Sequence, residues 1–530
     1  MATLAAPIAG AKQVGSHLKS NTLNLFDATV IATSSVAPAY SVAVTMALIV
    51  GFVGLASPAA ILVSFVPVLF IAFAYYYLNR MDPNCGASYS WISRTLSPYV
   101  GWFSGWVQLA ANILFCASAP IVAGTYTLQL LNSIFPGQIS TDVAGNKYLI
   151  AVVGIAWLAL VTFMVVRGIR VTANFQWVLV GLEYLIVLGF AVWAIVKIVG
   201  GQTAAANPIA SEWFNPASVS FGALAGGLAL GVFFFWGWDT AANVNEETKD
   251  SNRTPGQAGI ISMFVLLFIF LITAVAMQTL LSVDSINANS TDILYYFSTQ
   301  IASSPITYLM ILAVLSSTVA VVQTTLLPSS RLSFSMARDG VFPSAFGWVH
   351  RSWLTPWVGT LLSGVLALVI IVISLLVDSV NTVFANLILN IGVLVAVYYG
   401  LTGLACAWAF RRVLFRNVRM FVFAGLLPIA GALALFAIGG YVTYQALQAD
   451  VGSALPVLVT LGAGIPLLVV AVIFGSHSFF RQKTVSYIEV NGKLTTTEVA
   501  AAPSMPTMPA TAGAAPAMPL TPPPPPPGTP

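Results

Sequence analysis

The stretch FFFWGWDTAANVNEE, residues 233–247, decides the fold of this chain. Its first half is apolar and aromatic enough to lie in lipid, yet Asp239 follows Gly237 and two glutamates close the run. Glycine readily lets a helix stop, and an ionisable side chain within a membrane span is costly unless it serves a purpose. The stretch therefore predicts a membrane helix that is interrupted within the bilayer, with an acid at the interruption.

The composition of the whole chain is that of a membrane protein. Of its 530 residues 58% are hydrophobic and only 7% are charged, whereas soluble domains carry about 25% charged residues. No charged residue occurs between Asp27 and Arg80. Because the apolar runs are continuous, and a helix needs roughly 20 such residues to cross a bilayer, we predict an all-α polytopic membrane protein.

The apolar runs predict twelve membrane-spanning helices with both termini in the cytoplasm. Basic residues concentrate in cytoplasmic loops, and here alternate loops and the two terminal segments hold all of the Lys and Arg except Lys147 and Lys197. This bias predicts a multi-pass protein of the cytoplasmic membrane, and it explains the net charge of +4 without a nucleic-acid partner. The expected spans are 23–50, 58–79, 100–131, 147–166, 173–197, 217–243, 257–281, 303–330, 355–377, 381–410, 420–446 and 454–476.

Three regions follow from this pattern. Residues 1–22 are expected to form a cytoplasmic N-terminal segment, and residues 23–480 a twelve-helix domain. Residues 481–530 begin with the polar, strand-like VSYIEVNGK and become rich in Pro and Ala, which predicts a disordered cytoplasmic tail. Within the helical domain we expect two repeats, about 23–200 and 217–411, followed by two further helices over about 420–476.

A second interruption is predicted in the first span, at ATSSVAPAYS, residues 32–41. Ser34 and Ser35 weaken the helix, and Pro38 is suited to begin a second half-helix. If spans 1–5 and 6–10 are repeats, the two interruptions correspond, and five spans invert the second repeat. Paired broken helices at the midplane mark the binding site of a secondary transporter. The alternative is that Ser, Pro and Gly serve only for packing and kinks, as they often do in membrane helices.

The ends of half-helices suggest a substrate. Free N–H groups at the start of the second half of span 1 suit a carboxylate, and carbonyl groups at the ends of the first halves suit an ammonium group or a cation. An α-amino acid is the simplest molecule with both charges. A polyamine stays open, because it needs anionic groups and no carboxylate site.

Four motifs resemble the amino acid–polyamine–organocation superfamily of transporters. They are SSVAPAYS (34–41), DPNCGASYSWISRTLSPYVGWFSGW (82–106), FFFWGWDTAANVNEETKDSNRTPGQA (233–258) and LPSSRLSFSMARDGVFP (327–343), within a resemblance over about residues 20–480. The resemblance implies a leucine-transporter-type fold of five plus five inverted helices and two appended ones, with helices 1 and 6 broken. Where most members carry Gly-Ser/Ala-Gly in span 1, this chain differs, so its carboxylate-binding amides are placed by position. The substrate-binding residues implied are Ser34, Ser35, Val36, Ala37, Pro38, Asn112, Phe235, Trp236, Gly237, Trp238 and Asp239.

Individual residues at the second break have expected roles. Asp239 is expected to cap the helix that follows it, to attract an ammonium group, or to do both. Trp236 and Trp238 are expected to form an aromatic lid, with ordinary packing as the alternative. Glu246 and Glu247 are expected to form ion pairs near the cytoplasmic end with Lys249, Arg253 or Arg331.

Glu183 is the expected site of proton coupling. It lies inside span 5, seven residues after Gln176, where many proton-coupled relatives carry a Lys. A carboxyl buried in a span favours its neutral form and can gain and lose a proton. The resemblance places it near spans 1 and 8, where Ser316, Ser317 and Thr318 form a possible ion site. The alternatives are a permanently neutral, hydrogen-bonded Glu183, and sodium coupling through span 1 carbonyls and span 8 hydroxyls.

We therefore expect a secondary active importer of amino acids or related amines, driven by protons, with lipid as its surroundings. An amino acid or amine exchanger and a polyamine importer are the alternatives, and a transporter-fold nutrient sensor is less favoured. No catalytic constellation, metal cluster or phosphate-binding loop is visible, so we expect no enzyme activity and no cofactor besides the coupling ion, H⁺ or alternatively Na⁺. The sequence indicates no obligate protein partner.

Overall fold

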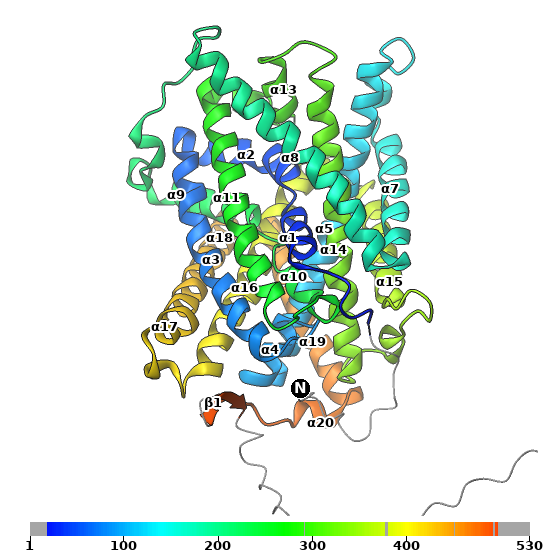
Figure 1. Ribbon diagram of the computed structural model, residues 1–530. Helices are drawn as coiled ribbons and strands as arrows, with labels where there is room; N and C mark the ends of the chain where they lie inside the picture. Colours follow the sequence, from blue (N-terminus) through cyan, green and yellow to red (C-terminus); the bar gives the residue numbers. More distant parts are fainter. Residues whose placement is uncertain (1–17, 291, 377–379, 450, 491–492, 497–530) are drawn as a thin grey trace, which may run out of the picture.

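The computed structural model describes residues 18–290, 292–376, 380–449, 451–490 and 493–496. Long helices stand side by side in one bundle, and several of the short helices and the strands lie at its ends (Figure 1). Residues 1–17 of the expected N-terminal segment and 497–530 of the expected tail lie outside the described residues.

The first half of the chain supplies six long helices and two short ones. They are α1 (Leu25–Val36), α2 (Pro38–Val53), α3 (Ser57–Met81), α4 (Ser88–Thr95), α5 (Pro98–Ile134), α6 (Thr141–Ala144), α7 (Lys147–Arg167) and α8 (Ile169–Val199).

The second half continues in the same way. It contains α9 (Phe221–Phe234), α10 (Thr240–Asn243), α11 (Thr254–Leu280), α12 (Val283–Ala288), α13 (Ile293–Thr299), α14 (Tyr308–Arg338), α15 (Trp357–Ser374), α16 (Val380–Phe410), α17 (Val418–Met420), α18 (Leu427–Ala449), α19 (Val451–Phe474) and α20 (His477–Phe480). Short 3₁₀ or π turns link them: η1 (Gly54–Ala56), η2 (Ser211–Phe214), η3 (Pro216–Ser218), η4 (Asn245–Glu247), η5 (Ser344–Gly347), η6 (Leu414–Arg416) and η7 (Phe421–Leu426).

Ten segments of the described chain are long and apolar enough to cross a membrane, so the predicted polytopic, all-helical membrane core is confirmed. Length and composition single out ten candidates rather than the expected twelve for two reasons. The first two expected spans join in one stretch, Leu25–Met81, and the sixth is represented by the shorter apolar helix α9, Phe221–Phe234.

Two places in the bundle leave the helical path. α1 ends at Val36, Ala37 takes a left-handed conformation (φ 49°, ψ 72°), and α2 begins at Pro38. Proline suits the first position of a helix because its missing N–H is not needed there. α9 ends at Phe234, Gly237 has φ +116°, and the four-residue α10 begins at Thr240.

A polar network joins the chain after α10 to α14 and to the N-terminal segment. Glu247 and Arg331 are fully buried and form two hydrogen bonds of 2.9 and 3.0 Å, as predicted for this pair. Glu246 instead binds Arg338 (2.8 and 3.1 Å), a partner that the sequence prediction missed. Burial alone would raise the pKa of Glu246, but the charge and hydrogen bonds of Arg338 outweigh it and lower that pKa.

The same network includes backbone pairing. The N–H groups of Thr22 and Leu23 donate to the carbonyl of Glu247 (2.8 and 3.1 Å), and the N–H of Lys249 donates to the carbonyl of Leu23 (2.8 Å). The segment that enters α1 and the segment that leaves η4 are thus fastened together, so the two interrupted regions are linked at this end of the bundle.

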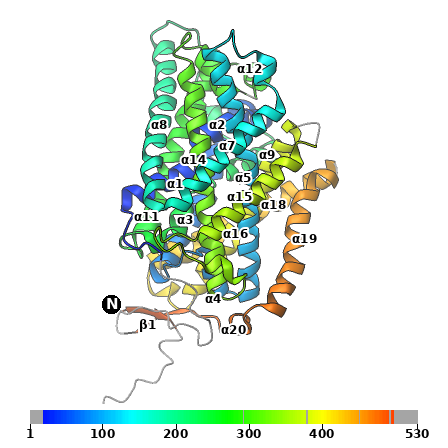
Figure 2. The ribbon, with the colours of Figure 1, turned by 90° about the vertical axis from the view of Figure 1, so that its right-hand side faces the viewer.

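The strands β1 (Tyr487–Val490) and β2 (Lys493–Thr496) pair antiparallel, with Tyr487 opposite Thr496. They include the stretch that was predicted to be strand-like, and residues 487–490 and 493–496 therefore do not share the disorder predicted for the tail. The strands lie with α20 at the end of the bundle where α4 lies (Figures 1 and 2).

Candidate functional site

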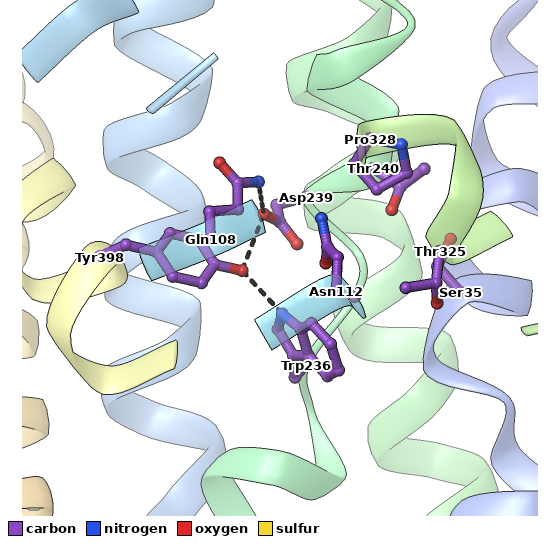
Figure 3. A pocket seen from close by; sticks show the side chains of 10 residues that line it. Ser35, Gln108, Asn112, Trp236, Asp239, Thr240, Thr325, Pro328 and Tyr398 are labelled. Atoms are coloured by element: carbon purple, nitrogen blue, oxygen red, sulfur yellow. Dashed lines mark hydrogen bonds between the residues drawn. The ribbon is translucent and has the colours of Figure 1, made fainter. Parts of the chain in front are cut away.

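A small cavity lies where the two interrupted regions meet α5, α14 and α16 (Figure 3). Measured as the space open to the centre of a water-sized sphere it is about 10 Å³, which is room for about one water molecule. An amino acid or amine therefore fits only if the walls move apart. The lining residues are Ser35, Gln108, Asn112, Trp236, Gly237, Asp239, Thr240, Thr325, Pro328 and Tyr398.

The two interruptions touch at Gly237. A Cβ atom built on this residue would lie 2.3 Å from the carbonyl oxygen of Ser35 and 2.7 Å from its carbonyl carbon. Its φ of +116° is also one that side-chain-bearing residues rarely adopt. Glycine is required here for two independent reasons, and it lets the backbone after α9 lie directly against the end of α1.

Asp239 follows this contact and is 3% exposed. Its carboxylate accepts hydrogen bonds from the hydroxyls of Tyr399 (2.8 Å), Tyr398 (3.1 Å) and Tyr75 (3.3 Å). The Nε2 of Gln108 lies 3.5 Å from the same carboxylate. Asp239 occupies the N-cap position of α10, but its side chain makes no capping hydrogen bond, so the predicted capping role is wrong. Side-chain donors from α3, α5 and α16 hold the carboxylate instead.

Trp236 completes this polar cluster. Its indole Nε1 donates to the hydroxyl of Tyr398 (2.7 Å), which donates in turn to Asp239. Figure 3 shows Trp236, Tyr398, Gln108 and Asp239 in one hydrogen-bonded chain beside the cavity. Hydrogen bonds to an ionised carboxylate are stronger than those between neutral groups, so this arrangement is suited to a charged Asp239.

The structure brings five of the predicted substrate-binding residues to the cavity: Ser35, Asn112, Trp236, Gly237 and Asp239. Ser34, Val36, Ala37, Pro38, Phe235 and Trp238 do not line it. Phe235 packs on Phe65 (ring centroids 5.5 Å apart), and Trp238 packs on Tyr75 (4.9 Å) and Tyr399 (5.6 Å) behind Asp239. Of the two tryptophans predicted to form a lid, Trp236 lines the cavity and Trp238 does not.

Sequence reasoning missed the other half of the lining and the tyrosines that hold Asp239. Gln108, Thr240, Thr325, Pro328 and Tyr398 line the cavity, while Tyr75 and Tyr399 bind the acid from behind. The adjacent pair Tyr398–Tyr399 in an apolar helix was the one usable signal. Thr325 and Pro328 give no such signal in the sequence, because residues of these types occur in many membrane helices for packing.

Glu183 lies in α8, fully buried, against the start of α2. Its Oε1 accepts the backbone N–H of Ala39 (2.7 Å) and the hydroxyl of Ser317 (2.9 Å), and Ser317 also accepts the N–H of Tyr40 (3.1 Å). The predicted proximity of Glu183 to span 1 and to Ser317 of span 8 is confirmed. Ser316 and Thr318 instead donate to carbonyls of their own helix, at 2.8 and 2.7 Å.

These contacts correct one expectation about α2. Its first N–H groups were predicted to be free for a substrate carboxylate. Pro38 has no N–H, and those of Ala39 and Tyr40 are taken by Glu183 and Ser317. The position suited to an anion is filled by the protein's own carboxyl group, as the dipole at a helix N-terminus favours.

Gln176, two turns before Glu183, holds the other side of the first interruption. The hydroxyl of Ser34 donates to its Oε1. Its Nε2 donates to the side-chain oxygen of Gln323 (2.6 Å) and to the carbonyl of Ala320 (3.0 Å). α8 therefore contacts the interruption on both sides, through Gln176 at the end of α1 and Glu183 at the start of α2, and each contact is shared with α14.

The helical fold is that of a multi-pass membrane protein with an enclosed polar site, and comparison with known proteins identifies its family. The family model described as "Amino acid permease" matches residues 23–465. The chain belongs to this family, within the amino acid–polyamine–organocation superfamily, and it is a permease rather than an enzyme.

Individual proteins similar to this chain are also named as importers or transporters. The chain is 28% identical over 351 residues to the low-affinity putrescine importer PlaP of Escherichia coli (strain K12), a match that covers 64% of this chain and 70% of that protein. It is 26% identical over 353 residues to the human large neutral amino acids transporter small subunit 2, covering 66% and 62%. It is 27% identical over 296 residues to the Asc-type amino acid transporter 1 of Mus musculus, covering 53% and 51%.

A solved structure shares the fold. The crystal structure of MhsT in complex with L-phenylalanine, a leucine-transporter-type structure, aligns with a TM-score of 0.53 and 15% identity. The alignment covers 80% of this chain and all of that one. At this identity the likeness concerns the fold alone.

The contact between Gly237 and Ser35 generates a prediction. Gly237→Ala should destabilise the protein by about 3 kcal/mol or more, because it combines an unfavourable backbone conformation with overpacking. The measurement is the midpoint of thermal unfolding of the purified protein in detergent. Gly181→Ala in α8 is the matched control, since open space surrounds the added methyl group. Equal midpoints for the two variants would contradict the close approach.

Proposed function

We propose that this permease imports an amino acid or a related amine across the cytoplasmic membrane by proton symport, through alternating access around the two interruptions. The observation that carries this proposal is the contact of Glu183 with the first N–H of α2, at 2.7 Å. A buried carboxyl group thereby lies at the junction of the two halves of an interrupted helix. The matching family and relatives support amino acids and amines as the classes of substrate.

The proposed architecture has twelve spans, with both termini in the cytoplasm. In it α1 and α2 are the two halves of span 1, and α9 and α10 belong to span 6. Spans 1–5 and 6–10 form inverted repeats, with α18 and α19 as the appended pair. The fold shared with MhsT and the contact between the interruptions support this assignment, since paired broken helices at the repeat interface bind substrate in such transporters.

The proposed coupling uses two states of Glu183. When ionised, its carboxylate accepts the N–H of Ala39 and the hydroxyl of Ser317 and stabilises the start of α2 against α8 and α14. When protonated, it loses most of the attraction for the helix dipole and the donors, and α2 is freer to move. Glu183 Oε2 has no partner among the described atoms, so it offers a place for the proton.

Exchange of one amino acid or amine for another is the second candidate mechanism. Under exchange Glu183 would be a structural group that fastens α2, and flux would need counter-substrate. Sodium coupling is a third, in which Ser317 and carbonyl groups near Ala37 would bind the ion in place of a proton.

The proposed topology predicts which loops face outward. Gln202→Cys, after α8, should react with a membrane-impermeant maleimide on intact cells. Asn417→Cys, before α17, should react only after the cells are permeabilised. The native Cys85, Cys116 and Cys406 are all buried and give a low background. Labelling of Asn417→Cys on intact cells would contradict the proposed orientation.

The proposed coupling predicts the behaviour of Glu183→Gln, which keeps the shape but cannot be ionised. In proteoliposomes, uptake driven by an inward proton gradient should be lost, while exchange against preloaded substrate persists. Glu212→Gln, at an exposed glutamate of η2, is the matched control and should behave like the native protein. Proton-driven concentrative uptake by Glu183→Gln would remove this residue from the coupling mechanism.

A further inference from the structure

The connection between α16 and α18, residues 411–426, is strongly basic. The sequence from 408 to 421 reads WAFRRVLFRNVRMF and holds four arginines, and no acidic residue occurs from 379 to 449. None of the described ion pairs includes Arg411, Arg412 or Arg419. Arg416 has an interaction within the chain and is set apart from these three.

This connection lies where two candidate membrane spans meet a membrane surface. One span comprises Asn390–Phe410 and the next begins at Val418, so residues 411–417 join two helices at the same surface of the bilayer. Figure 1 shows α17 at the outer edge of the bundle. The arginines are therefore placed beside lipid headgroups rather than over the middle of the protein.

Apolar side chains of the same connection are exposed. Phe415 is 86% exposed and Val418 is 78% exposed, and the ring of Phe415 packs on that of Phe421, with centroids 5.5 Å apart. Contact of these side chains with water is unfavourable, whereas aromatic residues are favoured where headgroups meet acyl chains. Exposed aromatic and basic side chains together are typical of a segment that lies in the membrane interface.

The backbone of the connection is packed on the bundle. Leu414 is buried and lies against Gly425 at the start of the next span. The guanidinium group of Arg411 lies over the ring of Trp408, 4.3 Å from its centroid, and donates to the Trp408 carbonyl at 2.6 Å. Arg412 beside it is exposed. The arginines therefore project from a backbone that is held in place, and a ligand does not have to order the segment before it binds.

From these observations we propose that the connection between α16 and α18 binds the headgroup of an anionic phospholipid. The guanidinium groups of Arg411, Arg412 and Arg419 would bind its phosphate, because arginine matches phosphate oxygens in charge and in geometry. Phe415 and Val418 would lie among the upper parts of its acyl chains. This site is separate from the cavity at the two interruptions, and it does not depend on which substrate or coupling ion the permease uses.

Native mass spectrometry of the full-length chain in detergent measures this binding. The protein is titrated with dioleoyl-phosphatidylglycerol, and with dioleoyl-phosphatidylcholine as a zwitterionic lipid that has the same acyl chains. The native chain should bind phosphatidylglycerol more tightly. The joint variant Arg411→Gln, Arg412→Gln and Arg419→Gln should weaken that binding about 100-fold, the combined contribution of three arginines at an anionic surface. Arg412→Gln alone should weaken it about fivefold.

The matched control removes the same charge elsewhere. Lys249→Gln, Arg253→Gln and Arg351→Gln, made together, change three exposed basic side chains of other connections and should leave the affinity for phosphatidylglycerol unchanged. Phe415→Ser should weaken binding of the diacyl lipid although every arginine remains. Thermal unfolding of each variant in detergent shows whether it folds. Should the joint variant not fold, the single variant Arg412→Gln, at an exposed side chain, still tests the site.

Four outcomes would overturn the proposal. The native chain could bind the two lipids equally, or the control variant could lose as much affinity as the joint variant. Full competition by excess inorganic phosphate would indicate a site for a free anion instead of a lipid. A dimer that Phe415→Ser abolishes would show that this surface binds a second copy of the chain. Unchanged affinity in folded Arg412→Gln and in the folded joint variant would remove these arginines from lipid binding.

Discussion

The close approach of Gly237 to the carbonyl group of Ser35 is the constraint on which the rest of the site depends. A side chain at residue 237 would collide with the backbone at the end of α1, so only glycine lets the two interrupted regions touch. Their contact places Ser35, Trp236 and Asp239 around one cavity. Because the two regions touch, a movement of α1 and α2 must also displace the segment between α9 and α10. Alternating access around these regions requires such a coupled movement.

Two buried carboxyl groups hold the two interruptions, each in a different way. Glu183 reaches from α8 to the first amide of α2 and therefore fastens the interruption from outside. Asp239 belongs to the interruption itself and is held by hydroxyls from α3 and α16. The Glu183 carboxyl group occupies a position that would suit a substrate anion, and the Asp239 carboxyl group lines the cavity. This division is the reason that we propose Glu183 for coupling and Asp239 for substrate binding.

The sequence predicted most of the framework because lipid leaves few choices. Continuous apolar runs had to be helices, and Pro38 and Gly237 marked the places where the helical path ends. The acids also stood out, since a charge within an apolar run is rarely incidental. The partners of these acids could not be predicted in the same way. Tyr75, Tyr398 and Tyr399 come from helices far apart in the chain, and only tertiary packing shows that their hydroxyls converge on Asp239.

We expect the substrate to bind where the two interruptions meet. A structure of the full-length protein in lipid nanodiscs with a transported amino acid or amine bound, determined by electron cryomicroscopy, is the direct test. We expect the amino group of the substrate about 3 Å from the Asp239 carboxylate, against Trp236, with Glu183 still bound to the start of α2. Substrate bound away from Ser35 and Gly237, or bound only where it displaces Glu183 from α2, would contradict this expectation.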